Sequence, residues 1–307
     1  LSTQEVDIIW RLLRMRLAVS VVNSTLLAAE SPSDDYITIS QAPAWRFLEK
    51  LDFNEGLIRA RLRSVCDMPI VEGADRVLNW ITKEKGKFAP LFGISLKNLE
   101  MKSLSAEKTS VPENPFELTR EEAKVIGTEN DENDTIWLGY YNEPRLIYTA
   151  PAFKKGPWKA SNRRTVHIAI DVFANKGTKL FAPMEGEVFT AEYRDSPLDY
   201  GGVVILKHTT PDNDEFFTLY GHLDPQFLDA LQVGDKIDKG QEFCKLGGPD
   251  VNGGWAPHVH FQIAMTTDGI EADWPGVADP DDLNFWNSVC PNPASMLNLE
   301  DHDCVYN

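Results

Sequence analysis

The first ninety residues carry apolar side chains at helical spacing. Val6, Trp10, Leu13, Leu17 and Val21 follow one another at intervals of three or four, which places them on one face of a helix. Residues 30–35 then gather Ser, Pro, Asp and Glu, a composition typical of a turn. The pattern therefore predicts a helix that ends near residue 30.

Three shorter helices are predicted after this turn. The second begins near Ser40 and has Pro43 in its first turn, where a helix accepts proline because no hydrogen bond is lost. It should direct Trp45 and Phe47 toward the core. The third and fourth lie around residues 57–62 and 77–81. We expect the first ninety residues to form a small helical bundle.

The chain changes character at residues 94–135. Lys, Glu, Ser and Thr dominate there, and residues 129–134 hold four acids. This composition predicts a linker, or a strap that lies on another domain.

Short β-rich runs follow from about residue 135. They lie at 166–173, 187–190, 203–206 and 216–220, with Gly and Pro between them, which is typical of an all-β sandwich or barrel. The fold class is therefore α+β: a helical segment at 1–93, a linker or strap at 94–135, and a β domain at 136–307. After Met265 we expect loop, and then a short helix at 293–299.

Charge and cysteine content indicate which binding partners and which cellular compartment to expect. With 30 basic and 47 acidic residues the net charge is −17, which argues against nucleic acid or an anionic membrane as the main partner. No uninterrupted apolar run approaches the about 18 residues of a membrane span. The four cysteines are scattered along the chain, which is typical of proteins that keep free thiols in a reducing compartment. No signal peptide is visible and the chain begins with Leu1, so we expect a cytoplasmic piece of a longer protein.

Histidines in the β region point to metal chemistry. Side chains two or four residues apart on a strand share a face, so His167 should project with Asp171, and His258 with His260. His222 lies at the end of another strand. Imidazole and carboxylate groups are ligands for Zn²⁺, and a catalytic zinc site uses three protein ligands and one open position. We therefore expect a catalytic zinc site among these strands.

Residues 164–264, within a domain of about 136–299, resemble peptidase family M23, the zinc-dependent peptidases of the lysostaphin type. That family's pattern runs HxGxD, YxHL, VxxGDxVxxGQ and HxHF. Ala169 stands where the family usually has Gly, and Gln262 where it often has Glu. The corresponding motifs here are His167-Ile-Ala-Ile-Asp171, Tyr220-Gly-His222-Leu223, Val233-Gly-Asp235-Lys-Ile237-Asp-Lys-Gly240-Gln241 and His258-Val-His260-Phe261.

The resemblance implies a role for each matched residue. His167, Asp171 and His260 correspond to the zinc ligands, and His222 and His258 to the catalytic pair. The implied activity is hydrolysis of a peptide or amide bond by metal-activated water in a zinc groove.

Three further expectations concern residues outside these motifs. His208 should be structural, and His302, in an acidic tail, is given no role. The segment 266–289 is longer than usual for the family and is expected on the groove rim.

Residues 5–65 loosely resemble the C-terminal helices of choline- and aminoglycoside-kinase-like phosphotransferases. The resemblance rests on Arg14-Met-Arg-Leu-Ala-Val-Ser-Val21 and Gln41-Ala-Pro-Ala-Trp-Arg-Phe-Leu48, and the catalytic kinase motifs are not in this chain. It implies a multidomain cytosolic protein in which an M23-like domain lies between a kinase-like domain and a PLP-dependent aminotransferase-like domain.

Three functions stay open at this point. The first is a zinc metallopeptidase that acts on a peptide. The second is a non-peptidase zinc enzyme of a multidomain protein, acting on a small amine or a phosphorylated metabolite. The third is a metal-stabilised scaffold that docks flanking domains; the intact His222 and His258 argue against it, because a scaffold does not need them.

Overall fold

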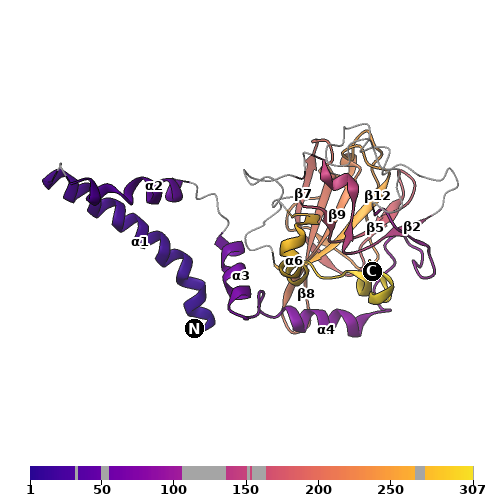
Figure 1. The fold of residues 1–307 in the computed structure, drawn as a ribbon. Helices are drawn as coiled ribbons and strands as arrows, with labels where there is room; N and C mark the ends of the chain where they lie inside the picture. The colour runs from indigo at the N-terminus through magenta and orange to yellow at the C-terminus, as the bar shows by residue number, and fades with distance from the viewer. Residues whose placement is uncertain are drawn as a thin grey trace. The chain divides into compact units, whose positions relative to one another are not determined.

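The computed structural model describes residues 1–31, 34–49, 55–105, 136–150, 153, 164–266 and 274–306, and every structural statement below concerns these residues. The chain forms two compact units, one at Leu1–Ile70 and the other from Val71 onward (Figure 1). The predicted boundaries at 93/94 and 135/136 stay predictions, since residues 106–135 of the predicted linker lie outside the described part.

The first unit is helical, as the apolar spacing predicts. A capping box of Ser2 and Glu5 opens the first helix, and Trp10 packs edge-on against Phe47 with ring centroids 5.7 Å apart. The elements are α1 (Thr3–Glu30), the 3-10 helix η1 (Asp35–Thr38), α2 (Gln41–Glu49) and α3 (Glu55–Val65).

The prediction that Trp45 points inward is wrong. Its side chain is 52% exposed, and its indole Nε1 donates to Glu49 Oε1 one turn further on. Ala44 is buried and Phe47 half-buried, so these smaller neighbours occupy the inner face of α2.

Helix α1 also meets the length and composition of a membrane span. An 18-residue window within it is apolar enough, and 11% of that window is buried. The hydropathy of this window is an average that includes the polar residues between the short apolar runs of the sequence. Length and composition do not separate a span from a packed helix, so the expected absence of a membrane partner stays a prediction.

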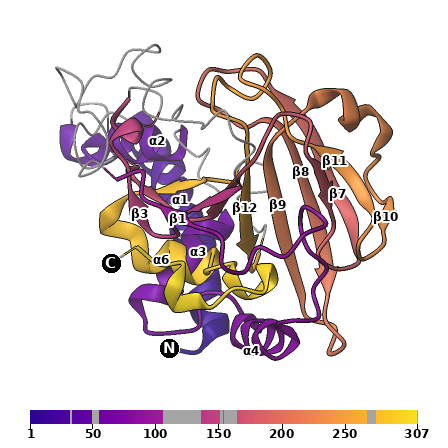
Figure 2. The same cartoon turned by 90° about the vertical axis from the view of Figure 1, so that its right-hand side faces the viewer.

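The second unit is built around one large sheet. Figure 2 shows its long strands β7, β8, β9 and β12 side by side. Neighbours in the sheet are antiparallel except β1 and β2. In spatial order the strands are β1 (Met101–Lys102), β2 (Trp137–Gly139), β5 (Ile170–Phe173), β12 (His258–Ala264), β9 (Glu215–Leu223), β8 (Gly201–Thr209), β7 (Gly186–Arg194) and β10 (Lys236–Ile237).

Smaller elements complete this unit. One helix, α4 (Ala74–Glu84), does not join the predicted bundle but packs its Trp80 ring 6.2 Å from Phe216 on the sheet. Two small sheets pair β11 with β6 and β4 with both β3 and β13. Their strands and the remaining helices are β6 (Lys179–Phe181), β11 (Glu242–Lys245), β3 (Glu143–Pro144), β4 (Val166–His167), β13 (Val277–Ala278), α6 (Leu283–Val289), η2 (Leu146–Thr149), η5 (Pro225–Ala230), η6 (Pro280–Asp282), η7 (Ala294–Leu297) and η8 (Asp301–Asp303).

Residues 166–173 are not the single strand that their alternation predicts. The chain leaves the small sheet after β4 and enters the large sheet at β5. Between them, the backbone N–H of Ile168 still donates to the carbonyl oxygen of Gly276, the residue before β13. His167 and Asp171 therefore belong to two different sheets, although they remain neighbours in space.

The expectation of loop after Met265 is also wrong for the described residues, whereas the place of segment 266–289 on the groove rim stays a prediction. This region supplies β13 and α6, and Trp274 is 1% exposed. The reason is a pairing partner far away in sequence: β13 pairs with β4, opposite His167. The short helix predicted at 293–299 is present as η7.

The buried His208 should make the stability of the fold depend on pH. It is buried on β8, with Nδ1 2.7 Å from the Glu185 carbonyl oxygen and Nε2 2.7 Å from Thr218 Oγ1. Burial lowers the pKa of His208 to about 4, while the unfolded residue titrates at about 6.5. Between these values the unfolded chain binds a proton that the folded chain does not. His208 alone should therefore lower the free energy of unfolding by about 3 kcal/mol as the pH falls from 6.5 to 4.

Urea unfolding of the metal-free chain at several pH values measures this loss. The variant His208→Gln should show a weaker pH dependence than the wild type, although other buried histidines still contribute. The exposed His302 offers the control, since His302→Gln should change nothing. An identical pH dependence in His208→Gln and wild type would contradict the prediction.

Candidate metal centre

Three predicted ligands meet where the small sheet joins the large one. His167 lies on β4, Asp171 on β5 and His260 on β12, and all three are buried. His167 Nε2 lies 3.1 Å from His260 Nδ1 and 3.2 Å from Asp171 Oδ1, and the latter two atoms are 3.4 Å apart. Ligands that surround a tetrahedral zinc at 2.0–2.1 Å are about 3.3 Å apart, so this triangle has the size that zinc requires.

The outer nitrogen of each imidazole faces a carbonyl-type oxygen. His167 Nδ1 is 3.1 Å from the Tyr140 carbonyl oxygen, and His260 Nε2 is 2.9 Å from Gln262 Oε1. The orientation of the Gln262 amide is fixed, because its Nε2 donates to the Pro275 carbonyl oxygen. We assign a hydrogen to both outer nitrogens from these partners.

This assignment leaves three acceptor atoms facing one another. The inner nitrogens of His167 and His260 then carry lone pairs, and Asp171 Oδ1 has no hydrogen-bond partner among the described residues. Buried acceptors with no hydrogen to share destabilise a fold unless something satisfies them. A cation at their centre would do so, and the donor set therefore fits zinc.

The protonation states suit a metal as well. Burial, with Arg145 as a further cause, lowers the pKa of His167 to about 4. Burial raises the pKa of Asp171, but His167 and Arg145 lower it, to well below its usual range. Near neutral pH His167 is uncharged, so Arg145 is the charge that keeps Asp171 ionised. A neutral imidazole and an ionised carboxylate are the forms that bind a metal.

A second pair of imidazoles lies beside this triangle. The rings of His222 and His258 have centroids 4.2 Å apart, and His258 Nε2 is 3.8 Å from Asp171 Oδ1. Their Nδ1 atoms face the carbonyl oxygens of Asn252 and Ala256 at 3.1 and 2.6 Å, which leaves each Nε2 as the basic nitrogen. Burial lowers the pKa of both rings, so both are neutral at pH 7.

His222 reaches this place through an unusual backbone conformation. Its φ is 63°, in the left-handed region that few non-glycine residues adopt. Two backbone hydrogen bonds hold it there, from His222 N to the Tyr200 carbonyl and from Gly247 N to the His222 carbonyl. Strain of this kind gathers at functional sites.

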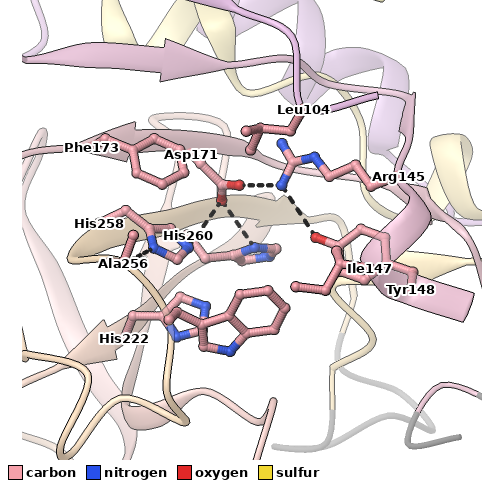
Figure 3. Close-up of a pocket in the computed structure, with 11 residues that line it drawn as sticks. Leu104, Arg145, Ile147, Tyr148, Asp171, Phe173, His222, Ala256, His258 and His260 are labelled. Carbon is pink, nitrogen blue, oxygen red and sulfur yellow. Dashed lines mark hydrogen bonds and ion pairs between the residues drawn. The ribbon is translucent and has the colours of Figure 1, made fainter. Parts of the chain in front are cut away.

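His222, His258, His260 and Asp171 line one pocket (Figure 3). Phe173 stacks on the His258 ring at 4.6 Å, and Trp255 lies 5.7 Å from the His222 ring. Leu104 contributes a further apolar wall. The walls therefore shield the basic nitrogens from bulk water.

The sequence did not reveal Arg145, Tyr148 or Trp255 as pocket residues. Arg145 and Tyr148 precede the motifs by about twenty residues, and no local spacing links them to Asp171. A signal was present in Glu143-Pro-Arg145, two charges next to the apolar run Leu146-Ile-Tyr148. Its meaning depends on a contact that only the folded chain shows.

Comparison with known proteins decides the family of this segment. Residues 165–272 match the family model described as peptidase family M23. This segment belongs to peptidase family M23. The match covers all five residues that carry the predicted site, and no curated protein matches the chain.

Solved structures similar to the chain include several peptidases. A zinc-containing peptidase from Vibrio cholerae is 20% identical over 40% of this chain and 36% of that one, with a TM-score of 0.27. The catalytic domain of the antimicrobial peptidase lysostaphin from Staphylococcus simulans is 23% identical over 43% of this chain and 86% of that domain, with a TM-score of 0.28. A putative peptidase M23 from Pseudomonas aeruginosa is 17% identical over 48% and 47% of the two chains, with a TM-score of 0.28.

The M23 assignment rests on the family model. The chain spans about a third of the Vibrio cholerae protein and about half of the Pseudomonas aeruginosa protein. Neither the family model nor these structures support the resemblance of residues 5–65 to kinase-like phosphotransferases, which stays a prediction.

Proposed function

We propose that the M23 domain is a zinc-dependent metallopeptidase that hydrolyses a peptide or amide bond. The proposal rests chiefly on one observation: three buried acceptors, which lie at zinc-site distances from one another, adjoin a pocket that is lined by two neutral imidazoles. The family of residues 165–272 supports it.

Zinc bound by His167, Asp171 and His260 would supply Lewis-acid activation of water and of a substrate carbonyl. The chain itself supplies the proton transfers. His222 and His258 each hold one ring nitrogen on a backbone carbonyl and present a basic Nε2 beside the ligands. One neutral ring accepts a proton, and the same or the second ring returns it to the leaving amine.

Peptide cleavage by the full chain tests this function. We expect the purified chain to cut peptides from a randomised, internally quenched library, to stop when a chelator removes the metal, and to recover when zinc is restored. The exposed His302→Ala variant serves as the control and should behave like the wild type.

Two other outcomes would point elsewhere. A zinc-loaded chain that cuts no peptide and no peptidoglycan, but acts on a small amine or phosphorylated metabolite, would favour the non-peptidase enzyme. A zinc-loaded chain with no activity on either panel would favour the scaffold.

A further inference from the structure

A buried arginine contacts one of the proposed metal ligands from outside the M23 segment. Arg145 Nη1 donates to Asp171 Oδ2 at 2.6 Å, and Arg145 Nε donates to Glu143 Oε2 at 2.8 Å. All three side chains are at most 5% exposed. In Figure 3 the guanidinium approaches the carboxylate on the side away from the imidazoles.

We propose that Arg145 is a positioning residue for the cation site. Its guanidinium binds Asp171 Oδ2, so that Oδ1 alone faces His167 and His260. The inference rests on the proposed metal binding and extends it to a residue that precedes the family segment. A carboxylate whose second oxygen is engaged binds an ion through one oxygen. The site then keeps three protein ligand atoms and the open position that catalytic zinc needs.

The fold holds Arg145 in place from two directions. Its backbone N–H donates to the Thr165 carbonyl oxygen at 3.0 Å. Its ion-pair partner Glu143 lies on β3 opposite His167 on β4, and Glu143 Oε1 accepts from the backbone N–H of Leu104. The arginine is thus fixed to the same strand that carries a metal ligand.

Gly139 provides the room for the guanidinium. It pairs with Asp171 across β2 and β5, and a Cβ at this position would lie 2.8 Å from Arg145 Nη2 and 3.5 Å from Asp171 Cβ. Any side chain at 139 would therefore require the Arg145 guanidinium to shift from its present position.

The same guanidinium also bridges to the pocket wall. Arg145 Nη1 lies 3.2 Å from the hydroxyl oxygen of Tyr148 as well as 2.6 Å from Asp171. The planar fork of arginine can hold two carboxylates and a hydroxyl in one fixed arrangement, whereas a lysine ammonium is a single point of charge. Lysine should therefore replace Arg145 only in part.

Metal binding without substrate tests the proposal. In Arg145→Met we expect the affinity for zinc, measured against a competing chelator, to fall about 10- to 100-fold. With Co²⁺ as the probe, the visible absorption should weaken, because a released Asp171 can bind through both oxygens and raise the coordination number. Arg145→Lys should give values between Arg145→Met and the wild type in both measurements.

A matched arginine–aspartate pair away from the site is the control. Arg76 pairs with Asp214 through two hydrogen bonds and is 64% exposed, so Arg76→Met should bind both metals like the wild type. The proposal is overturned if Arg145→Met folds and matches the wild type in zinc affinity and cobalt spectrum. If Arg145→Met does not fold, Arg145→Lys decides by the same two measurements.

The experiments distinguish a failure of the proposed peptidase function from a failure of the proposed role of Arg145. A chain that binds zinc with the expected dependence on Arg145 but cuts no peptide supports the positioning role and contradicts the peptidase. A wild type that binds no metal contradicts both.

Discussion

His260→Ala is expected to leave the chain without zinc and without peptidase activity. The imidazole supplies one of three protein ligands, and a structural-type zinc site binds with about 10–16 kcal/mol. Loss of a third of that energy, about 3–5 kcal/mol, lowers affinity about 100- to several-thousand-fold. Metal analysis after gel filtration should find about one zinc per wild-type chain and none in the variant.

The control for this result is a histidine that the fold does not use. His302 is 81% exposed and pairs only with the neighbouring Asp303 among its described contacts, so His302→Ala should keep its zinc. Stoichiometric zinc of wild-type affinity in His260→Ala would show that the three converging side chains are not the metal site.

His258→Asn is expected to keep the zinc and lose turnover. Asparagine can still donate to the Ala256 carbonyl as the Nδ1 of His258 does, but it has no basic nitrogen to accept a proton. General acid–base catalysis contributes about 10²- to 10⁴-fold, so kcat should fall by that factor. KM should change little, since the lost interaction acts only in the transition state.

Zinc content and kcat measured on the same preparation separate the two roles. His222→Asn should behave in the same way, because its ring is the other neutral imidazole beside the ligands. An unchanged kcat in both variants, with zinc retained, would remove these histidines from the mechanism; loss of zinc would make them ligands instead.

Local pattern was enough to predict the helices of the first ninety residues and to single out the histidines of the β region; the resemblance to the family implied which of them are ligands. The capping box at Ser2 and the apolar spacing of α1 depend only on residues within one or two turns. His258 and His260 share a face because alternation is a property of any strand. Features of this kind are set by near neighbours in sequence, so the chain shows them before it folds.

Other features depend on partners far away in sequence. The break between β4 and β5 arises because β4 pairs with residues 143–144 and 277–278, which no alternation pattern reveals. The contact of Arg145 with Asp171 spans twenty-six residues. The strand β13 gives no strand signal in the sequence, because Val277–Ala278 is too short to show a period.

The two-residue strand β4 has a consequence for how the domain can be isolated. Its neighbour β3 precedes the family match and its neighbour β13 follows it. A polypeptide trimmed to residues 165–272 would keep every motif of the family yet strip His167 of both flanking strands. The shortest stretch that folds on its own should therefore exceed the family match at each end, and inactivity of such a trimmed fragment would say nothing about the chemistry of the intact chain.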